Sequence, residues 1–142
     1  EIWRPVSAEA PLVMVFDVPE QAELLGTAQG WRAYAHPDGD YRIVAQTVAA
    51  GSMEEAVQKI EGIPAEALRG RIREGERRCS LGWYAVEEDG GYLYRTEILA
   101  GEDHYYALTF SVREEDGTTY DSTEEQTFAS FGLISDETVR EK

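Results

Sequence analysis

The last third of the chain alternates apolar and polar side chains with a period of two, and this pattern restricts the fold more than any other feature. In the segment HYYALTFSV, one side of the chain carries His104, Tyr106, Leu108, Phe110 and Val112. Such alternation is typical of a β-strand with one buried face. Burial of each large apolar side chain contributes about 1.5–3 kcal/mol, so this face decides how the segment folds.

Similar segments precede it, separated by turn residues. From Arg71 onward, the stretches RIREGERRC, SLGWYAVEEDGGYLYRTEIL and HYYALTFSV predict about four antiparallel strands. Glycines close the hairpins between them, at Gly90-Gly91 and at Gly101. Further upstream, Pro11 to Val18 predicts a buried strand, and Asp38-Gly39 predicts a hairpin turn between two more strands.

The clearest helix signal lies between Ser52 and Gly62. Ser52 followed by Glu55 forms a capping box, and Gly62 is a typical left-handed helix terminator. The segment from Glu20 to Ala28 predicts a second, short helix, and the segment from Pro64 to Arg69 predicts one more helical turn.

A C-terminal helix is predicted by a second capping box, formed by Ser122 and Glu125. Phe128 and Phe131 lie three residues apart on one face of this helix, and Gly132 is its expected stop. We therefore expect a single α+β domain over residues 1–134, followed by a polar tail over residues 135–142.

The order of these elements resembles a known family. The ending YYALTFSV…TFASFGL, after a group of meander strands and a mid-chain helix preceded by DYRIVAQTV, looks like the PsbP-like fold, named after an extrinsic photosystem subunit. The resemblance implies an αβα arrangement, in which helices sandwich an antiparallel β-sheet. It also implies an extracytoplasmic location, as in small bacterial lipoproteins. It implies no catalytic residues, because a shared fold does not carry a shared chemistry.

The charge balance excludes several classes of partner. The chain has 13 Lys and Arg against 28 Asp and Glu, which gives a net charge of −15. Such a surface repels nucleic acids and anionic membranes, since both are bound through clustered basic residues. Cys79 is the only cysteine, so an internal disulfide is excluded. The sequence begins at Glu1 rather than Met, so we expect an upstream segment such as a secretory or lipoprotein signal with a lipid anchor.

An arginine-rich stretch is the strongest local anomaly. The segment RGRIREGERR lies just before the predicted strand that contains Trp83. Guanidinium groups bind carboxylates and phosphates through paired hydrogen bonds, which predicts a ligand site. The alternative is a solvated edge strand whose charges balance nearby Glu residues. The predicted ligand-binding residues are Arg71, Arg73, Arg77, Arg78 and Trp83.

Aromatic residues on both sides of the predicted strands allow two interpretations. One is a groove with stacking platforms for a peptide, glycan or small ligand. The other is a sheet covered by helices on both faces. Metal and catalytic motifs are weak: His36 and His104 lie near acidic residues, but no HExxH, EF-hand or GxSxG pattern occurs. We predict no metal, no cofactor and no catalytic residue.

These observations favour an extracytoplasmic binding or interaction domain for a protein or small-molecule ligand, the soluble part of a lipoprotein. Two alternatives stay open. The first is a small hydrolase or isomerase that uses His36 or His104 with a carboxylate at hydrogen-bond distance in a cleft. The second is a structural subunit of an envelope assembly, which would expose a large apolar patch.

Overall fold

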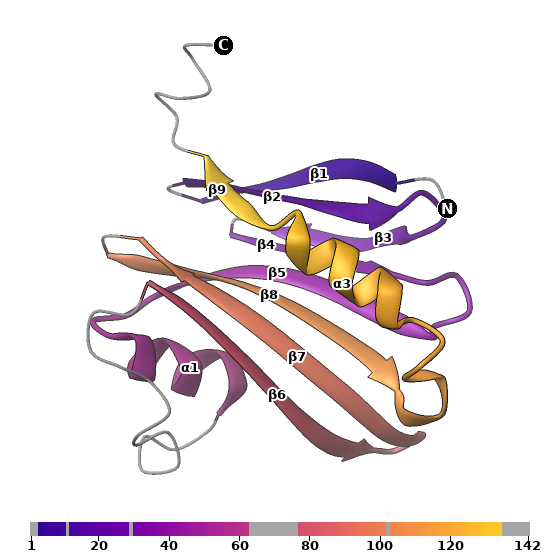
Figure 1. Ribbon diagram of the computed structural model, residues 1–142. Coiled ribbons are helices and arrows are strands. Elements are labelled where there is room, and N and C mark those ends of the chain that lie inside the picture. Colours follow the sequence, from indigo (N-terminus) through magenta and orange to yellow (C-terminus); the bar gives the residue numbers. More distant parts are fainter. Residues whose placement is uncertain (1–2, 11, 29, 63–76, 102, 135–142) are drawn as a thin grey trace.

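The computed structural model describes residues 3–10, 12–28, 30–62, 77–101 and 103–134, and these form two antiparallel β-sheets and two α-helices (Figure 1). The three-stranded sheet has the order β1-β2-β9, and the six-stranded sheet has the order β3-β4-β5-β8-β7-β6. The elements are β1 (Trp3–Ala10), β2 (Leu12–Pro19), β3 (Glu23–Ala28), β4 (Trp31–Ala35), β5 (Tyr41–Ala49), α1 (Met53–Glu61), β6 (Arg78–Glu87), β7 (Gly90–Ala100), β8 (His104–Arg113), the short 3-10 helix η1 (Glu114–Asp116), α3 (Asp121–Ala129) and β9 (Gly132–Ile134).

The predicted α+β class is confirmed, with helices packed on antiparallel sheets. One face of the six-stranded sheet, here called the α1 face, carries Ile98 and Ala107, which pack against Met53 and Val57 of α1. The opposite α3 face is covered by α3 together with the three-stranded sheet. A second sheet therefore shares one of the two outer layers with a helix.

The main core lies on the α3 face. Tyr106, Leu108 and Phe110 of β8 are buried there, with no more than 1% of each side chain exposed. They pack with Met14 and Phe16 of β2, and Phe128 of α3 joins the same cluster. The alternation seen in the sequence is thus confirmed, and this apolar burial holds the two sheets and α3 together.

Helix α1 follows its predicted signals closely. The Ser52 hydroxyl accepts a hydrogen bond from the Glu55 backbone N–H, with an N···O distance of 3.1 Å. Gly62 ends the helix in the left-handed conformation, with φ of 71°. The expected extra turn from Pro64 to Arg69 and the expected polar tail lie outside the described residues.

The helix predicted from Glu20 to Ala28 is wrong, because this segment contains strand β3. Its backbone pairs with β4 from Glu23 opposite Ala35 to Ala28 opposite Trp31, with a bulge between Leu24 and Gly26. Pairing with the next strand of the sheet overrides the weak local helix preference of a short Ala-, Glu- and Leu-containing segment.

The ends of α3 also differ from the prediction. The helix begins at Asp121, and Tyr120 occupies its N-cap position, so Ser122 is not the cap. The Tyr120 hydroxyl donates to Asp40 at 2.7 Å, and this tertiary contact fixes where the helix starts. Gly132 is not a helix stop, because it begins β9, which pairs with β2.

Two further differences concern strands. The described part of the Arg71–Val112 region holds three strands rather than four, since Arg78 and Cys79 continue directly into β6. Strand β1, over Trp3–Ala10, was not predicted; it pairs with β2 along its whole length.

Candidate functional site

The structure places the two predicted ligand residues of β6 on opposite faces of the sheet. Trp83 lies four residues after Cys79 on the same strand, so the two side chains point to the same face, and Cys79 belongs to the cluster on the α1 face. Arg78 points to the opposite face, the α3 face, where its guanidinium donates a hydrogen bond to Glu97. Because side chains alternate along a strand with a continuous register, Arg78 and Trp83 do not line one surface.

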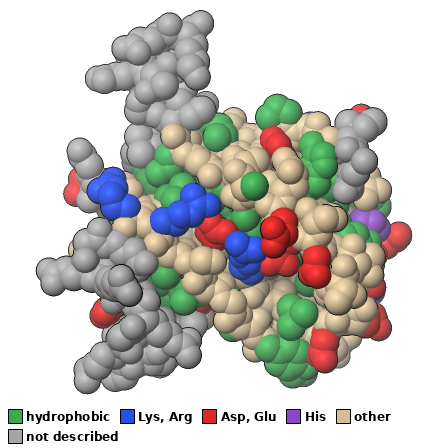
Figure 2. All heavy atoms as spheres, viewed as in Figure 1, with side chains coloured by type: hydrophobic (Ala, Val, Ile, Leu, Met, Phe, Trp, Pro, Cys, Tyr) green, Lys and Arg blue, Asp and Glu red, His purple; other side chains and the backbone are tan. Residues whose placement is uncertain are grey.

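Arg78 belongs to a charged cluster beside α3. The carboxylate of Glu97, a residue only 4% exposed, accepts from Arg78 Nε at 2.9 Å, from Arg78 Nη2, and from Arg95 Nη2 at 2.8 Å. Arg95 also lies 3.7 Å from Glu124 and 4.5 Å from the ring centre of Phe128. Figure 2 shows basic and acidic side chains adjacent to one another in the middle of this view.

The other predicted arginines form no described site with these residues. Arg77 is exposed and donates to the Ala100 carbonyl at 3.2 Å, while Arg71 and Arg73 lie outside the described residues. An Arg78 guanidinium already bound to Glu97 has fewer donors left for a ligand. The arginine site therefore stays a prediction.

Trp83 belongs instead to a row of aromatic residues on the α1 face, here called the aromatic strip and consisting of Trp83, Tyr94 and Tyr92. The rings of Trp83 and Tyr94 stack, with centroids 4.9 Å apart and an interplanar angle of 8°. Tyr92 continues the strip, with its ring centroid 6.4 Å from that of Tyr94. Because α1 packs near Ile98, at the other end of β7, the strip is only half-buried.

Tyrosine hydroxyls near the strip bond to carboxylates. Tyr94 donates to Glu87 at 2.6 Å, and Tyr92 donates to Asp89 at 2.7 Å. Burial and the Glu87 carboxylate raise the pKa of Tyr94 to about 12. The bond from Tyr92 lowers the pKa of Asp89, which therefore stays ionised.

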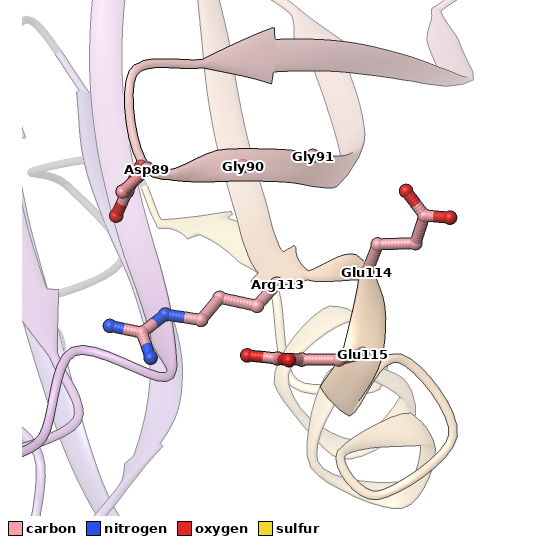
Figure 3. A pocket seen from close by; sticks show the side chains of 6 residues that line it. All are labelled: Asp89, Gly90, Gly91, Arg113, Glu114 and Glu115. Carbon is pink, nitrogen blue, oxygen red and sulfur yellow. The ribbon is translucent and has the colours of Figure 1, made fainter.

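The strip leads into a pocket at the β6–β7 turn, here called the hairpin pocket. Its volume is about 390 Å³, and it is lined by Asp89, Gly90, Gly91, Arg113, Glu114 and Glu115. Figure 3 shows the side chains of Arg113 and Glu115 extending in the same direction, with Asp89 and the two glycines across from them. The strip and the pocket meet where Tyr92 donates its hydrogen bond to Asp89.

The charges of the hairpin pocket are mixed. Arg113 supplies one guanidinium, and its pKa is raised by a hydrogen bond with Tyr92 and by Asp40 and Asp89. Glu114 is held by Tyr84, and this bond raises the pKa of the Tyr84 phenol. The arrangement offers hydrogen-bond donors and acceptors of both charges next to stacked aromatic rings, which suits recognition of a polar ligand that also carries an apolar or ring portion.

Neither histidine is placed as a catalytic group of this pocket. His36 Nδ1 accepts from the Asp38 backbone N–H at 3.0 Å, and its distance to Asp40 Oδ2 is 3.8 Å, longer than a hydrogen bond. His104 begins β8, and neither histidine lines the hairpin pocket. Within the described residues, no group of three or more His, Cys, Asp or Glu side chains is placed to hold a metal ion.

A buried carboxyl group at the end of α1 is a further feature of the α1 face. Both carboxylate oxygens of Glu61 are shielded from solvent, and neither makes a hydrogen bond of normal geometry. Burial raises the pKa of Glu61 to about 7, although the nearby Thr96 hydroxyl opposes this shift. Thr96 shares its own hydrogen bond with Thr109, with an O···O distance of 2.8 Å.

No family model and no curated protein matches the chain. Solved structures do. The Ran-binding protein Mog1p of Saccharomyces cerevisiae matches with a TM-score of 0.57 and 9% identity, over 96% of this chain and 99% of that chain. LpqN, involved in cell envelope biogenesis of Mycobacterium tuberculosis, matches with a TM-score of 0.57 and 14% identity, over 94% of this chain and 91% of that chain. The chain has the Mog1p/PsbP-like fold.

The cyanobacterial PsbP of Synechocystis sp. PCC 6803 also matches, with a TM-score of 0.48 and 11% identity over 85% of this chain and 86% of that chain. This chain spans about half the length of a Bacteroides thetaiotaomicron protein that it matches, since it covers 46% of that chain at a TM-score of 0.55 and 11% identity. Mog1p and LpqN share the fold of this chain, but at 9% and 14% identity the likeness says nothing about a shared function. No α-helix in the described ranges is long and apolar enough to cross a membrane.

The sequence predicted Trp83 as a ligand-binding residue, but it did not predict the hairpin pocket next to the aromatic strip. The glycine pair that signals the turn was visible, yet Arg113 reaches the same place only because β7 and β8 pair, with Tyr92 opposite Arg113. The alternation of β6 could have separated Arg78 from Trp83, because the two residues differ by five positions.

Proposed function

We propose that this chain is a non-enzymatic binding domain of the cell envelope, and that its ligand lies along the aromatic strip and ends in the hairpin pocket. The observation that carries the proposal is the continuity of Trp83, Tyr94 and Tyr92 with the pocket through the Tyr92–Asp89 hydrogen bond. A half-buried aromatic surface beside a pocket with convergent polar groups is the usual form of a ligand site.

The chemistry of the two parts indicates the kind of ligand. The stacked rings of Trp83 and Tyr94 provide a flat apolar surface for a sugar ring or a peptide side chain. The pocket carries three carboxylates and one guanidinium, from Asp89, Glu114, Glu115 and Arg113. This balance favours hydroxyl-rich or basic groups over anions.

The tyrosines of the strip favour binding over proton transfer. A general base must be deprotonated near neutral pH, but Tyr94 has a pKa of about 12 and the pKa of Tyr92 is also raised, by its bond to Asp89. Both phenols therefore keep their protons at neutral pH, and each donates its one O–H to a carboxylate, Tyr94 to Glu87 and Tyr92 to Asp89, which fixes the two rings. Such groups orient a ligand without changing it.

The envelope location rests on two supports. LpqN, which shares the fold, is a protein involved in cell envelope biogenesis. The net charge of −15 disfavours nucleic-acid partners and direct adsorption to anionic lipid. We therefore propose an extracytoplasmic domain of a lipoprotein, held at the membrane through an upstream lipid anchor.

A thermal-shift screen tests the binding site with two probes chosen for this chemistry, chitotriose and trilysine. We expect one of them to raise the melting temperature in a saturable way, and we expect Trp83→Ala to remove the effect. Trp31→Ala is the matched control, because Trp31 lies on β4, four strands away from β6 in the sheet, and packs over Gly26. Equal shifts in both variants would place the binding elsewhere, and no shift with either probe would count against these ligand classes.

A further inference from the structure

Strand β6 is the last strand of the six-stranded sheet, and its outer edge has no strand partner among the described residues. It is ten residues long and pairs with β7 in one continuous register, from Arg78 opposite Leu99 to Glu87 opposite Gly90. A long edge strand without a bulge presents a row of backbone N–H and C=O groups that can pair with another strand.

The opposite edge of the same sheet is protected. Strand β3 is six residues long, and a bulge between Leu24 and Gly26 breaks its register with β4. Bulges and short length are two common ways in which proteins prevent edge-to-edge pairing. Strand β6 has neither feature, so the two edges are not equivalent.

The side chains of β6 on the α3 face are matched in size for pairing with a second β6. Tyr84 and Val86 are exposed by 53% and 74%. Two positions on the same face, Ser80 and Gly82, carry a small side chain or none. An antiparallel copy centred on Trp83 places Val86 opposite Ser80 and Tyr84 opposite Gly82, so no two bulky side chains on this face lie directly opposite each other.

The charges at the ends of β6 are also complementary to a reversed copy. Arg77 and Arg78 stand at its start, and Glu87 and Glu88 stand at its end. Antiparallel pairing brings the basic end of one copy beside the acidic end of the other, whereas parallel pairing brings like charges together. We propose that β6 is a self-complementary edge at which two copies of this chain pair antiparallel, forming a two-fold symmetric dimer with a continuous sheet.

Long-range charge opposes this dimer and predicts its salt dependence. Each copy carries a net charge of −15, so two copies repel each other. The Debye length is about 30 Å at ~0.01 M salt and about 8 Å at ~0.15 M, so the repulsion is largely screened at the higher salt. The dimer should therefore be stronger in ~0.15 M salt than in ~0.01 M salt.

Sedimentation equilibrium of the whole chain tests the proposal. We expect a monomer–dimer equilibrium in ~0.15 M salt, and we expect Val86→Lys to weaken it roughly tenfold, because a lysine on an edge strand blocks pairing. The matched control is Leu25→Lys on β3, where Leu25 is 56% exposed, and it should leave the equilibrium unchanged. A monomer at all concentrations, or equal weakening by both variants, would overturn the proposal.

Disulfide trapping tests the register. Opposite residues in an antiparallel pair have Cα atoms about 4.5–5.5 Å apart, a distance that a disulfide can span. Under mild oxidation, a mixture of the Ser80→Cys and Val86→Cys chains should give a covalent heterodimer, and neither chain alone should give a comparable yield. Equal yields in the mixture and in the separate chains would overturn this register.

Discussion

The rings of Trp83 and Tyr94 lie stacked across the β6–β7 pair, with centroids 4.9 Å apart and planes inclined by 8°. The two residues are directly opposite each other in the strand register, so the backbone pairing and the ring stacking fix the same geometry. The Tyr94 hydroxyl is held by Glu87, one residue before the turn. The site is therefore rigid at the aromatic strip and open at the hairpin pocket.

Tyr94→Phe should make the protein less sensitive to alkaline pH. Because the pKa of folded Tyr94 is raised to about 12, the folded state keeps its proton while an unfolded tyrosine loses it from about pH 10. The free energy of unfolding therefore falls as pH rises between about 10 and 12. Urea unfolding across this range should show a smaller fall in the variant. An equal fall in the variant and the wild type would contradict the raised pKa of Tyr94.

Glu61→Gln should stabilise the protein at alkaline pH and have little effect under acidic conditions. The folded pKa of about 7 lies above the ordinary glutamate value of 4.5, so the folded state binds the proton more tightly and stability falls as pH rises through this window. The carboxyl oxygens of Glu61 are buried, but the residue as a whole is only half-buried and can turn towards water, so we expect a gain of only about 1 kcal/mol near pH 8 and almost none near pH 4.5.

The control for this prediction is Glu125→Gln, an exposed glutamate on the other helix. Its free energy of unfolding should change by less than about 0.5 kcal/mol at both pH values. If Glu61→Gln changed the free energy equally at the two pH values, the raised pKa of Glu61 would be contradicted.

Glu97→Gln should destabilise the fold by about 1–3 kcal/mol, because it removes the negative charge that pairs Arg78 and Arg95. The Arg78 side chain is 51% exposed and the Arg95 side chain is 34% exposed, so both guanidinium groups can turn towards water in the variant. The loss of free energy of unfolding is therefore no larger than this. Chemical denaturation measures the change. Glu124→Gln, whose carboxylate is 3.7 Å from Arg95, should cost less than about 0.5 kcal/mol. Equal effects would show that Glu97 is not the centre of the cluster.

Gly101→Ala should destabilise the β7–β8 hairpin by about 1–3 kcal/mol. A Cβ atom at this position would lie 2.8 Å from Tyr106 Cε1 and 2.9 Å from the His104 carbonyl oxygen, and the Tyr106 ring is buried. Gly82→Ala is a matched control, because its nearest neighbour would be the Tyr94 carbonyl oxygen at 3.6 Å, an ordinary contact. Thermal unfolding should show a clear loss for Gly101→Ala alone, and similar melting temperatures would contradict the close approach.

The sequence predicted best where a local rule and the tertiary structure agree. Ser52, Glu55 and Gly62 define α1 through contacts within a few residues, and β8 shows its buried face by simple alternation. The segment from Glu20 to Ala28 failed for the opposite reason. Its local composition suits a short helix, but pairing with β4 decides its conformation.

The candidate site could be predicted only in part from the sequence, for a similar reason. Trp83 was identified from its position in a predicted strand, and its partner Tyr94 follows from the register. The hairpin pocket also needs Arg113, which lies 24 residues after Asp89 in the printed sequence and arrives there through the pairing of β7 with β8. Contacts of this kind depend on strand order, which no short motif encodes.

The most direct test of the proposed binding site is a nuclear magnetic resonance titration that follows the indole N–H signals of the tryptophans while chitotriose or trilysine is added. We predict that the Trp83 signal and the amide signals of Tyr92 and Arg113 move together in a saturable way, while the Trp31 signal stays in place. A saturating probe that moves the Trp31 signal and leaves the Trp83 signal unchanged would contradict the site.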